Sequence, residues 1–184
     1  MLTEIITDYL VLFPDESEGL ALLQKQVAGG EVLNNRKNFR GHITAGGIVL
    51  SPDKTKLLLV HHKIFDRWFQ PAGHWDEEDA NPLVAAKREV VEETAVQLKD
   101  YLPVDTTHPL VPLDINSHYI PGNPLKKEAE HYHHDFRYVF IAQREELAFE
   151  VKEVHAAVWA AFDDPRIEAG LRGVVAKLRK FKLI

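Results

Sequence analysis

The sequence predicts a layered α/β or α+β domain, because strand-like runs and segments of helical periodicity follow one another along the chain. The clearest strand is HITAGGIVL over 42–50, and the clearest helix covers 82–94. The chain has 184 residues and 45% hydrophobic side chains, enough for the core of one domain, or of one domain with an appendage.

The first 38 residues have the pattern of a helical appendage. Apolar side chains at helical spacing predict helices over 3–13 and 16–27, and Gly29-Gly30 ends the second one. We therefore expect an appendage over 1–38 and the principal domain over 39–184. Three roles stay open for these helices: packing on the domain, covering its pocket, or forming a homodimer.

The remaining elements follow from turn residues and short apolar runs. In chain order, we expect a strand over 56–62, an aromatic loop over 64–71, extended segments near 109–120, 132–142 and 153–162, and a last helix opened by Asp163-Asp164-Pro165.

Composition excludes several classes of protein. The chain has no cysteine, which excludes disulfides, zinc–thiolate sites and thiol nucleophiles. The net charge of −6 argues against a nucleic acid polymer as partner. No apolar run reaches the roughly 18 residues of a membrane-spanning helix, and the acidic start lacks a signal-peptide pattern. We expect a cytoplasmic protein with no membrane partner.

The most informative segment is PAGHWDEEDANPLVAAKREVVEETAV, residues 71–96. Asn81 is a good N-cap and Pro82 suits the first helical position, so a helix should begin here. At about 100° per residue, three carboxylates fall on one stripe of this helix. They are Glu89, Glu92 and Glu93.

Three neighbouring carboxylates repel one another, and the i,i+4 pair Glu89 and Glu93 costs about a few tenths of a kcal/mol even when exposed. A hard divalent cation offsets this repulsion, because Mg²⁺ takes carboxylate oxygens and leaves positions for water and substrate phosphate. A solvated acidic helix face is the alternative interpretation. Arg88 lies four residues before Glu92, where the two side chains can pair.

The segment resembles the Nudix box, GX5EX7REUXEEXGU with U aliphatic. Gly73 matches its first position, Asp79 its acidic position, and REVVEE over 88–93 matches REUXEE in full. Asp79 replaces the usual Glu, and one extra residue precedes Arg88. Ala95 stands where the family has a helix-ending Gly, which should cost ~1 kcal/mol of strain. No departure removes a metal-binding carboxylate, and a subset of the family with GH-x-x-x-x-D has the same extra residue.

The resemblance implies an α/β/α sandwich with a mixed sheet and a Mg²⁺- or Mn²⁺-dependent hydrolase of nucleoside diphosphate derivatives. It implies that the glutamates on the helix stripe, with the backbone of Gly73, hold the metal, and that Arg88 orients them. A glutamate from the box or from a later loop would act as general base. The residues implied are Gly73, Glu89, Glu92 and Glu93 for the metal, and Arg88, Glu92, Glu93, Glu150 and Glu153 for catalysis.

Residues 128–140, EAEHYHHDFRYVF, are unusually rich in histidine. As a strand, this segment places His131, His133, Asp135 and Arg137 on one face. Three interpretations stay open: a second metal site, a surface that contacts phosphate or the metal's outer coordination shell, and a hydrogen-bonded strand in which Asp135 pairs with Arg137. The similar Nudix subset also carries His and Asp here.

Further side chains are candidates for contacts with a small-molecule nucleotide. His61 and Arg67 follow a strand and precede the box, where they could clamp a phosphate. His74 directly follows Gly73. The full set of expected substrate contacts is His61, Arg67, His74, His131, His133 and Arg137.

Three functions come from different classes. The first is hydrolysis of the diphosphate linkage in an NDP-sugar or ADP-ribose. The second is the isomerase branch that the same family implies, which needs a cysteine that the chain lacks. The third is a non-catalytic nucleotide-binding module or regulator. The retained box carboxylates favour the first, and the family makes a homodimer the favoured assembly.

Overall fold

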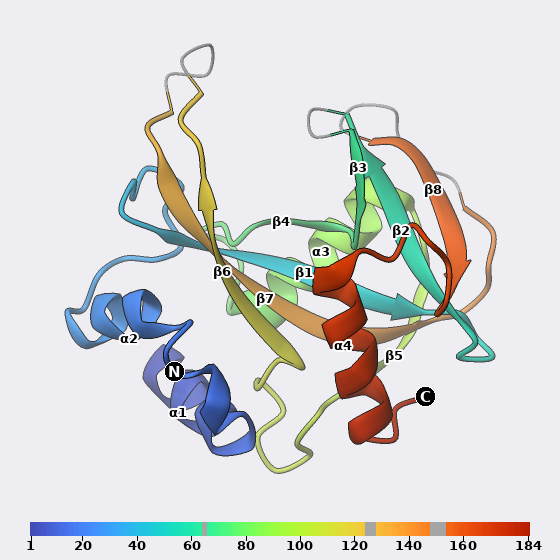
Figure 1. Ribbon diagram of the computed structural model, residues 1–184, viewed down its shortest axis with the longest axis horizontal. Helices are drawn as coiled ribbons and strands as arrows, with labels where there is room; N and C mark the ends of the chain where they lie inside the picture. The colour runs from blue at the N-terminus through green and yellow to red at the C-terminus, as the bar shows by residue number, and fades with distance from the viewer. Residues whose placement is uncertain (64–65, 124–127, 148–153) are drawn as a thin grey trace.

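In the computed structural model of the protein, which describes residues 1–63, 66–123, 128–147 and 154–184, helices lie on both faces of a mixed sheet (Figure 1). The strands are β1 (His42–Leu50), β2 (Lys56–His62), β3 (Arg67–Phe69), β4 (Ala72–His74), β5 (Leu98–Leu102), β6 (Asp114–Ile120), β7 (His131–Ala142) and β8 (Val154–Ala161). The helices are α1 (Leu2–Leu12), α2 (Ala21–Ala28), α3 (Pro82–Thr94) and α4 (Ala169–Lys180), with a 3₁₀ turn over Pro14–Glu16.

The sheet is organised around β1 and β7, which pair in parallel over the whole length of β1. The main strand order is β3-β2-β1-β7-β5, while β4 pairs with β1, β6 with β7 and β8 with β2. These other pairings are antiparallel. The sheet is therefore mixed, and the expected α/β/α layering is confirmed.

Alternate residues of β1 face different helices, so the core has two halves. Ala45 belongs to the cluster that includes residues of α3, whereas Ile48 belongs to the cluster that includes residues of α4. Gly47 permits the close approach of α3, because a Cβ there would lie 2.2 Å from the Cγ2 atom of Val90. This close contact brings the acidic helix against the strands that carry the site.

The N-terminal helices pack on the sheet domain. Ile5, Tyr9 and Leu23 are buried in the same cluster as α3. The Tyr9 hydroxyl accepts a 2.9 Å hydrogen bond from the backbone N–H of Ile115 on β6. Of the three roles considered for this segment, packing is observed. No helix among the described residues combines the length and the apolarity that crossing a membrane needs.

Several sequence-based boundaries were wrong. The second helix begins at Ala21 rather than at residue 16, because a 3₁₀ turn over Pro14–Glu16 and further turns over 17–20 precede it. The segment expected as a loop over 64–71 contains β3, whose Trp68 pairs with His61 of β2. The strands β4 and β5 were not predicted.

The last helix begins at Ala169 and not at residues 163–165. Asp164 instead stabilises a turn: its side chain accepts hydrogen bonds from the backbone and the guanidinium of Arg166, and its carbonyl accepts one from the N–H of Ile167. This local network offers the backbone an alternative to the helix.

Candidate active site

The site is built where strand β4 crosses the acidic face of α3. The ends of α3 agree with the sequence: the Asn81 side chain accepts a 3.1 Å hydrogen bond from the N–H of Val84, and Ala95 adopts the left-handed conformation with φ of 52°. The helix therefore begins and ends where its residue pattern predicts. The helix packs against β1 and β4.

Gly73 and Glu89 are in direct contact. A Cβ atom on Gly73 would lie 2.2 to 2.4 Å from the carboxyl atoms of Glu89, a separation that real Cβ atoms do not show. Only glycine at this position lets the carboxylate lie against the strand backbone. The contact places an acidic oxygen pair beside the backbone of residue 73.

The carboxylate of Glu93 is held against the same strand. The backbone N–H of Ala72 donates a 3.0 Å hydrogen bond to its Oε2 atom. Glu89 and Glu93, one helical turn apart, are therefore both held at β4. The pattern expected for the helix stripe is thus present, with two of its three acids docked on neighbouring residues of one strand.

Arg88 connects the parts of the site. Its Nη1 atom donates to Glu89 at 2.7 Å and to Glu92 at 3.2 Å. Its Nη2 atom donates to the carbonyl of His74 at 2.9 Å and to Asp79 at 2.8 Å. The guanidinium thus fixes the helix acids relative to β4. The expected i,i+4 pair of Arg88 with Glu92 is present.

Asp79, which matches the acidic position of the box, is one of the buried partners of Arg88. Its Oδ2 atom also accepts a hydrogen bond from the backbone N–H of Asp76, and its carbonyl accepts one from the indole of Trp75. The shorter Asp side chain therefore serves to orient Arg88 and to close the loop before α3.

The acids differ in their exposure. The side chain of Glu89 is 14% exposed, whereas that of Glu92 is 57% exposed. Burial raises the pKa of Glu89 to about 7, although Arg88 acts in the opposite direction. A buried carboxyl group with a raised pKa favours a cation as neighbour, and the all-oxygen donor set of these glutamates fits Mg²⁺ or Mn²⁺.

A second group of titratable side chains lies across the sheet from the acids. His42 starts β1 opposite His133 of β7, while His74 of β4 faces Thr44 of β1. The centroid of the His42 ring lies 5.2 Å from that of His74, 4.9 Å from that of His131 and 4.8 Å from that of His133. Burial lowers the pKa of His74 to about 4 and that of His133 to about 2, so both rings are neutral at neutral pH.

The predicted alternation of the His-rich strand is confirmed. His133 and Asp135 pair in register with His42 and Thr44, and so share their face of the sheet. His134 is on the opposite face, where its Nε2 atom bonds the side chain of Gln26 at 2.9 Å. Sequence reasoning did not connect His42 with this strand, because their pairing spans most of the domain.

Asp135 and Arg137 have their charges balanced locally. The carboxylate of Asp135 accepts hydrogen bonds from Thr44, Gln70 and Arg137, the last at 2.9 Å. Arg137 also pairs with Asp114 at 3.0 Å. The Asp135–Arg137 pair, which belonged to one of the three interpretations of this strand, is present, and neither group presents an unbalanced charge to a ligand.

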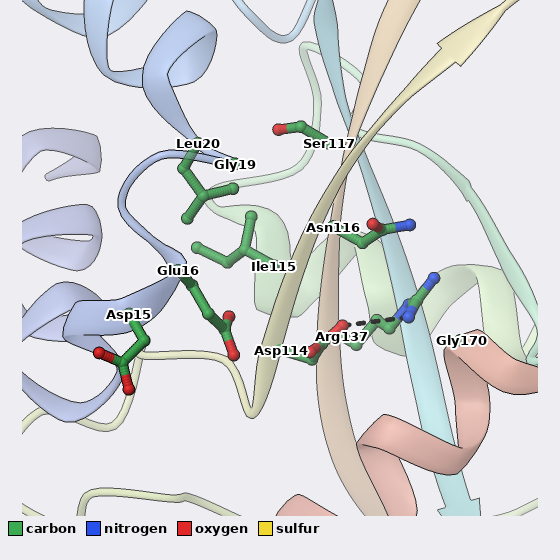
Figure 2. Close-up of a pocket in the computed structure, with 10 residues that line it drawn as sticks. All are labelled: Asp15, Glu16, Gly19, Leu20, Asp114, Ile115, Asn116, Ser117, Arg137 and Gly170. Carbon is green, nitrogen blue, oxygen red and sulfur yellow. Dashed lines mark hydrogen bonds and ion pairs between the residues drawn. The ribbon is translucent and has the colours of Figure 1, made fainter.

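Arg137 lines a cavity of about 340 Å³ between the N-terminal segment, β6 and α4 (Figure 2). Its other charged lining residues are Asp15, Glu16 and Asp114. An excess of carboxylates repels a diphosphate, so this cavity does not suit the nucleotide that the box implies. The acids of α3 are not among its lining residues.

The other expected site residues are not brought to the acids by the described contacts. Arg67 of β3 is engaged in an ion pair with Glu168, next to α4. The ring of His61 on β2 packs against Trp68, and its Nε2 atom lies 3.4 Å from the Oδ1 atom of Asp66. Glu150 and Glu153, expected as alternative general bases, lie outside the described residues.

Comparison with known proteins agrees with this architecture. The model of the NUDIX domain family matches residues 41–178. A probable DHNTP pyrophosphohydrolase of Lactococcus lactis subsp. cremoris is 27% identical over 137 residues, covering 74% of this chain and 76% of that protein.

Solved structures show the same fold. A NUDIX family hydrolase from Clostridium perfringens superposes with a TM-score of 0.53 at 21% identity, over 81% of this chain and 98% of that one. The dihydroneopterin triphosphate pyrophosphohydrolase of E. coli gives a TM-score of 0.55 at 14% identity, over 77% and 96%. The family match and the fold together define a hydrolase of the Nudix type. The chain belongs to the Nudix family.

Proposed function

We propose that the chain hydrolyses the diphosphate linkage of a nucleoside diphosphate derivative, such as an NDP-sugar or ADP-ribose, with Mg²⁺ or Mn²⁺ held by the α3 acids. The observation that supports this most is the docking of Glu89 and Glu93 on Gly73 and Ala72. This arrangement brings the carboxylates of two helix acids to neighbouring residues of one strand, and carboxylate oxygens are the donors that a hard cation takes.

Each residue has a defined part in the proposal. Glu89, Glu92 and Glu93 would hold the cation beside the backbone of Gly73, and the bound cation would neutralise the diphosphate and lower the pKa of its water. Arg88 keeps the glutamates in position through its contacts with Glu89, Glu92 and the backbone of β4. Glu92 or Glu93 accepts a proton from the attacking water, which contributes about 10²–10⁴-fold to the rate.

Retention of the acids argues against a purely regulatory or binding role. A module that only binds a nucleotide has no need to hold carboxylates together against their repulsion. Here Glu89 is kept buried despite a raised pKa, and Arg88 offsets only part of that cost. The arrangement is best explained by a bound cation that acts in the reaction.

The substrate class is tested by a turnover screen with Mg²⁺ and with Mn²⁺. The panel contains NDP-sugars, ADP-ribose, dinucleoside polyphosphates, coenzyme A and nucleoside triphosphates. Dihydroneopterin triphosphate is added, because the Lactococcus relative and the E. coli protein are named for that substrate. Preferential turnover of a nucleoside diphosphate derivative supports the proposal, whereas preference for the pterin triphosphate would replace its substrate class.

The role of the acids is tested in the same assay with Glu93→Gln. We expect kcat to fall by at least about 10²-fold with the fold intact, because proton transfer or cation binding is lost. Glu77→Gln is the matched control, since it removes an exposed carboxylate from the loop before α3. Turnover of Glu93→Gln within tenfold of wild type, roughly, would remove Glu93 from the mechanism.

The homodimer stays a prediction within this proposal, and light scattering on the full chain measures it. The cytoplasmic location expected from the acidic, cysteine-free sequence also stays a prediction.

A further inference from the structure

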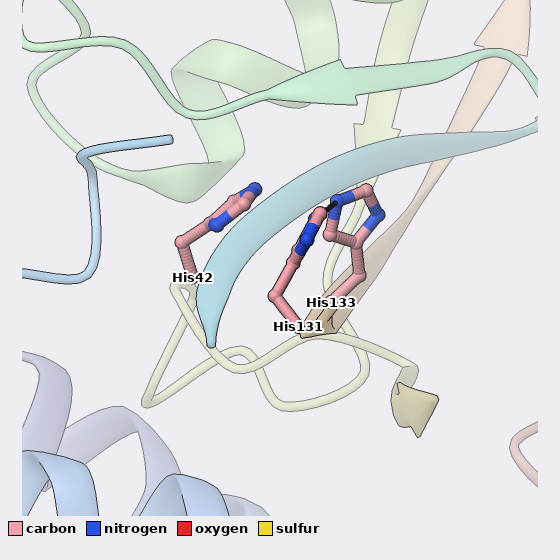
Figure 3. Close-up of side chains that lie close together, drawn as sticks. All are labelled: His42, His131 and His133. Atoms are coloured by element: carbon pink, nitrogen blue, oxygen red, sulfur yellow. Dashed lines mark hydrogen bonds between the residues drawn. The ribbon is translucent and has the colours of Figure 1, made fainter. Parts of the chain in front are cut away.

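We propose that His42, His131 and His133 form a second cation site, which binds one Zn²⁺ ion and is separate from the acidic site on α3. The three rings come from the first residues of two neighbouring strands (Figure 3). One ligand nitrogen from each ring lies within 4.8 Å of the other two. The inference goes beyond the proposed hydrolysis and does not depend on it.

The backbone orients two of the rings for this role. The Nδ1 atom of His42 lies 3.2 Å from the carbonyl oxygen of Asn38, and that of His131 lies 2.8 Å from the carbonyl oxygen of Ala129. A carbonyl oxygen only accepts, so each Nδ1 must carry the proton and donate. In a neutral ring, Nε2 then carries the lone pair, which is the arrangement found in metal-ligating histidines.

The Nε2 atom of His42 makes no hydrogen bond with any described residue, although the side chain is buried and only 2% of the residue is exposed. Such an atom costs free energy unless a partner satisfies it. The Nε2 atoms of His131 and His133 lie 3.0 Å apart. A cation between these rings supplies the partner that His42 lacks and accepts lone pairs from all three.

The spacing suits a tetrahedral ion after small side-chain movements. Zn–N bonds of about 2.0–2.1 Å place ligand nitrogens about 3.4 Å apart. The His131–His133 pair is already this close, so ring rotation at His42 closes the site. Three protein nitrogens leave a fourth position for water.

The chemistry of the ligands selects the ion. Imidazole nitrogens suit zinc and other first-row transition metals, whereas Mg²⁺ requires oxygen donors. Asp135, the nearest acid in the strand pattern, is not available as a fourth ligand, because Thr44, Gln70 and Arg137 already bind its carboxylate. The site therefore differs in kind from the all-oxygen site on α3.

The test is a Zn²⁺ titration of the tag-free full chain after chelator treatment, with Mg²⁺ in large excess to occupy the acidic site. We expect one Zn²⁺ per chain, together with a rise in Tm. Loss of an outer hydrogen-bonding partner weakens metal sites by about 10–100-fold, so loss of a direct ligand in His131→Gln or His133→Gln should weaken binding by at least that factor.

His118→Gln is the matched control, because its ring neighbours His133 at 5.8 Å but does not belong to the trio. We expect it to bind Zn²⁺ as wild type does. His133 is only partly buried, so its variant tests the site even if His42→Gln fails to fold, and the Tm of each metal-free variant reports folding. The Glu89→Gln variant should keep the site.

Three results would overturn the proposal. They are the absence of stoichiometric Zn²⁺ binding by the folded wild-type chain, unchanged Zn²⁺ affinity in His131→Gln and His133→Gln, and loss of Zn²⁺ binding in Glu89→Gln.

Discussion

The carboxylate of Glu89 occupies the space into which any side chain at position 73 would project. The glycine of the box is thus explained by contact with the helix acid, and not by a turn. Since Arg88 binds both Glu89 and the carbonyl of the next strand residue, His74, strand and helix hold each other in register. Cation binding in our proposal depends on this contact.

The first prediction concerns Gly73→Ala. The added methyl group forces Glu89 away from β4, so we expect weaker Mg²⁺ binding and a kcat lower by about 10²-fold, as for loss of a well-positioned catalytic group. Calorimetric titration of Mg²⁺ and steady-state kinetics measure the two effects. Gly173→Ala is the control, because a Cβ there meets nothing within 4 Å, and Ala in a helix should stabilise by about 0.5–1 kcal/mol. Unchanged Mg²⁺ affinity in Gly73→Ala would contradict the proposed role of the Gly73–Glu89 contact in cation binding.

The second prediction concerns Arg88→Lys. Lysine keeps the positive charge but lacks the planar fork that binds Asp79, Glu89 and the β4 backbone together. We expect kcat and Mg²⁺ affinity to fall by about 10–100-fold, the usual effect of removing a group that orients metal ligands. Lys87→Arg, at an exposed position of the same helix, should change neither. Wild-type kinetics in Arg88→Lys would show that charge alone suffices.

The third prediction concerns pH. Because burial raises the pKa of Glu89 from 4.5 to about 7, the metal-free folded state retains a proton that the unfolded chain releases. Glu89 therefore contributes less to stability as the pH rises from 4.5 through 7. A cation relieves the cost of the ionised form, so the rise in Tm on adding Mg²⁺ should be larger at pH 8 than at pH 6.

Glu89→Gln should remove both the Mg²⁺ effect and this part of the pH dependence. Differential scanning calorimetry at the two pH values, with and without Mg²⁺, provides the measurement. An equal Mg²⁺-induced shift at pH 6 and pH 8 would speak against the buried carboxyl group as a ligand.

The fourth prediction concerns the end of α3. Ala95 adopts a left-handed conformation with φ of 52°, which strains a residue with a Cβ. Ala95→Gly should raise the free energy of unfolding by ~1 kcal/mol, measured by denaturant titration. The control Lys87→Gly, at an exposed position inside the helix, should lower the free energy of unfolding by about the same amount. Destabilisation by Ala95→Gly would refute the strain argument.

The helix and the long strands could be predicted because their signals are local. Asn81, Pro82 and Ala95 mark the ends of α3, and β1 and β2 have the bounds that their apolar runs indicate. Short strands could not be predicted in this way. β4 contains only Ala72–His74, and its structure depends on pairing with β1.

The same distinction holds for the site. Arg88 and the three glutamates lie on one helix, so their shared face follows from helical geometry. The meeting of His42 with His131 and His133 depends on the parallel register of β1 and β7, strands that are far apart in the sequence. No local pattern encodes that register, although a His at the start of a strand was a visible signal.

The most direct test of the central claim is a crystal structure of the full chain soaked with Mn²⁺, with anomalous scattering used to locate the ion. The account predicts a Mn²⁺ peak bonded to the carboxylates of Glu89 and Glu93, beside the β4 backbone at Gly73. Carboxylates that point apart, with no ion among them at saturating Mn²⁺, would contradict it.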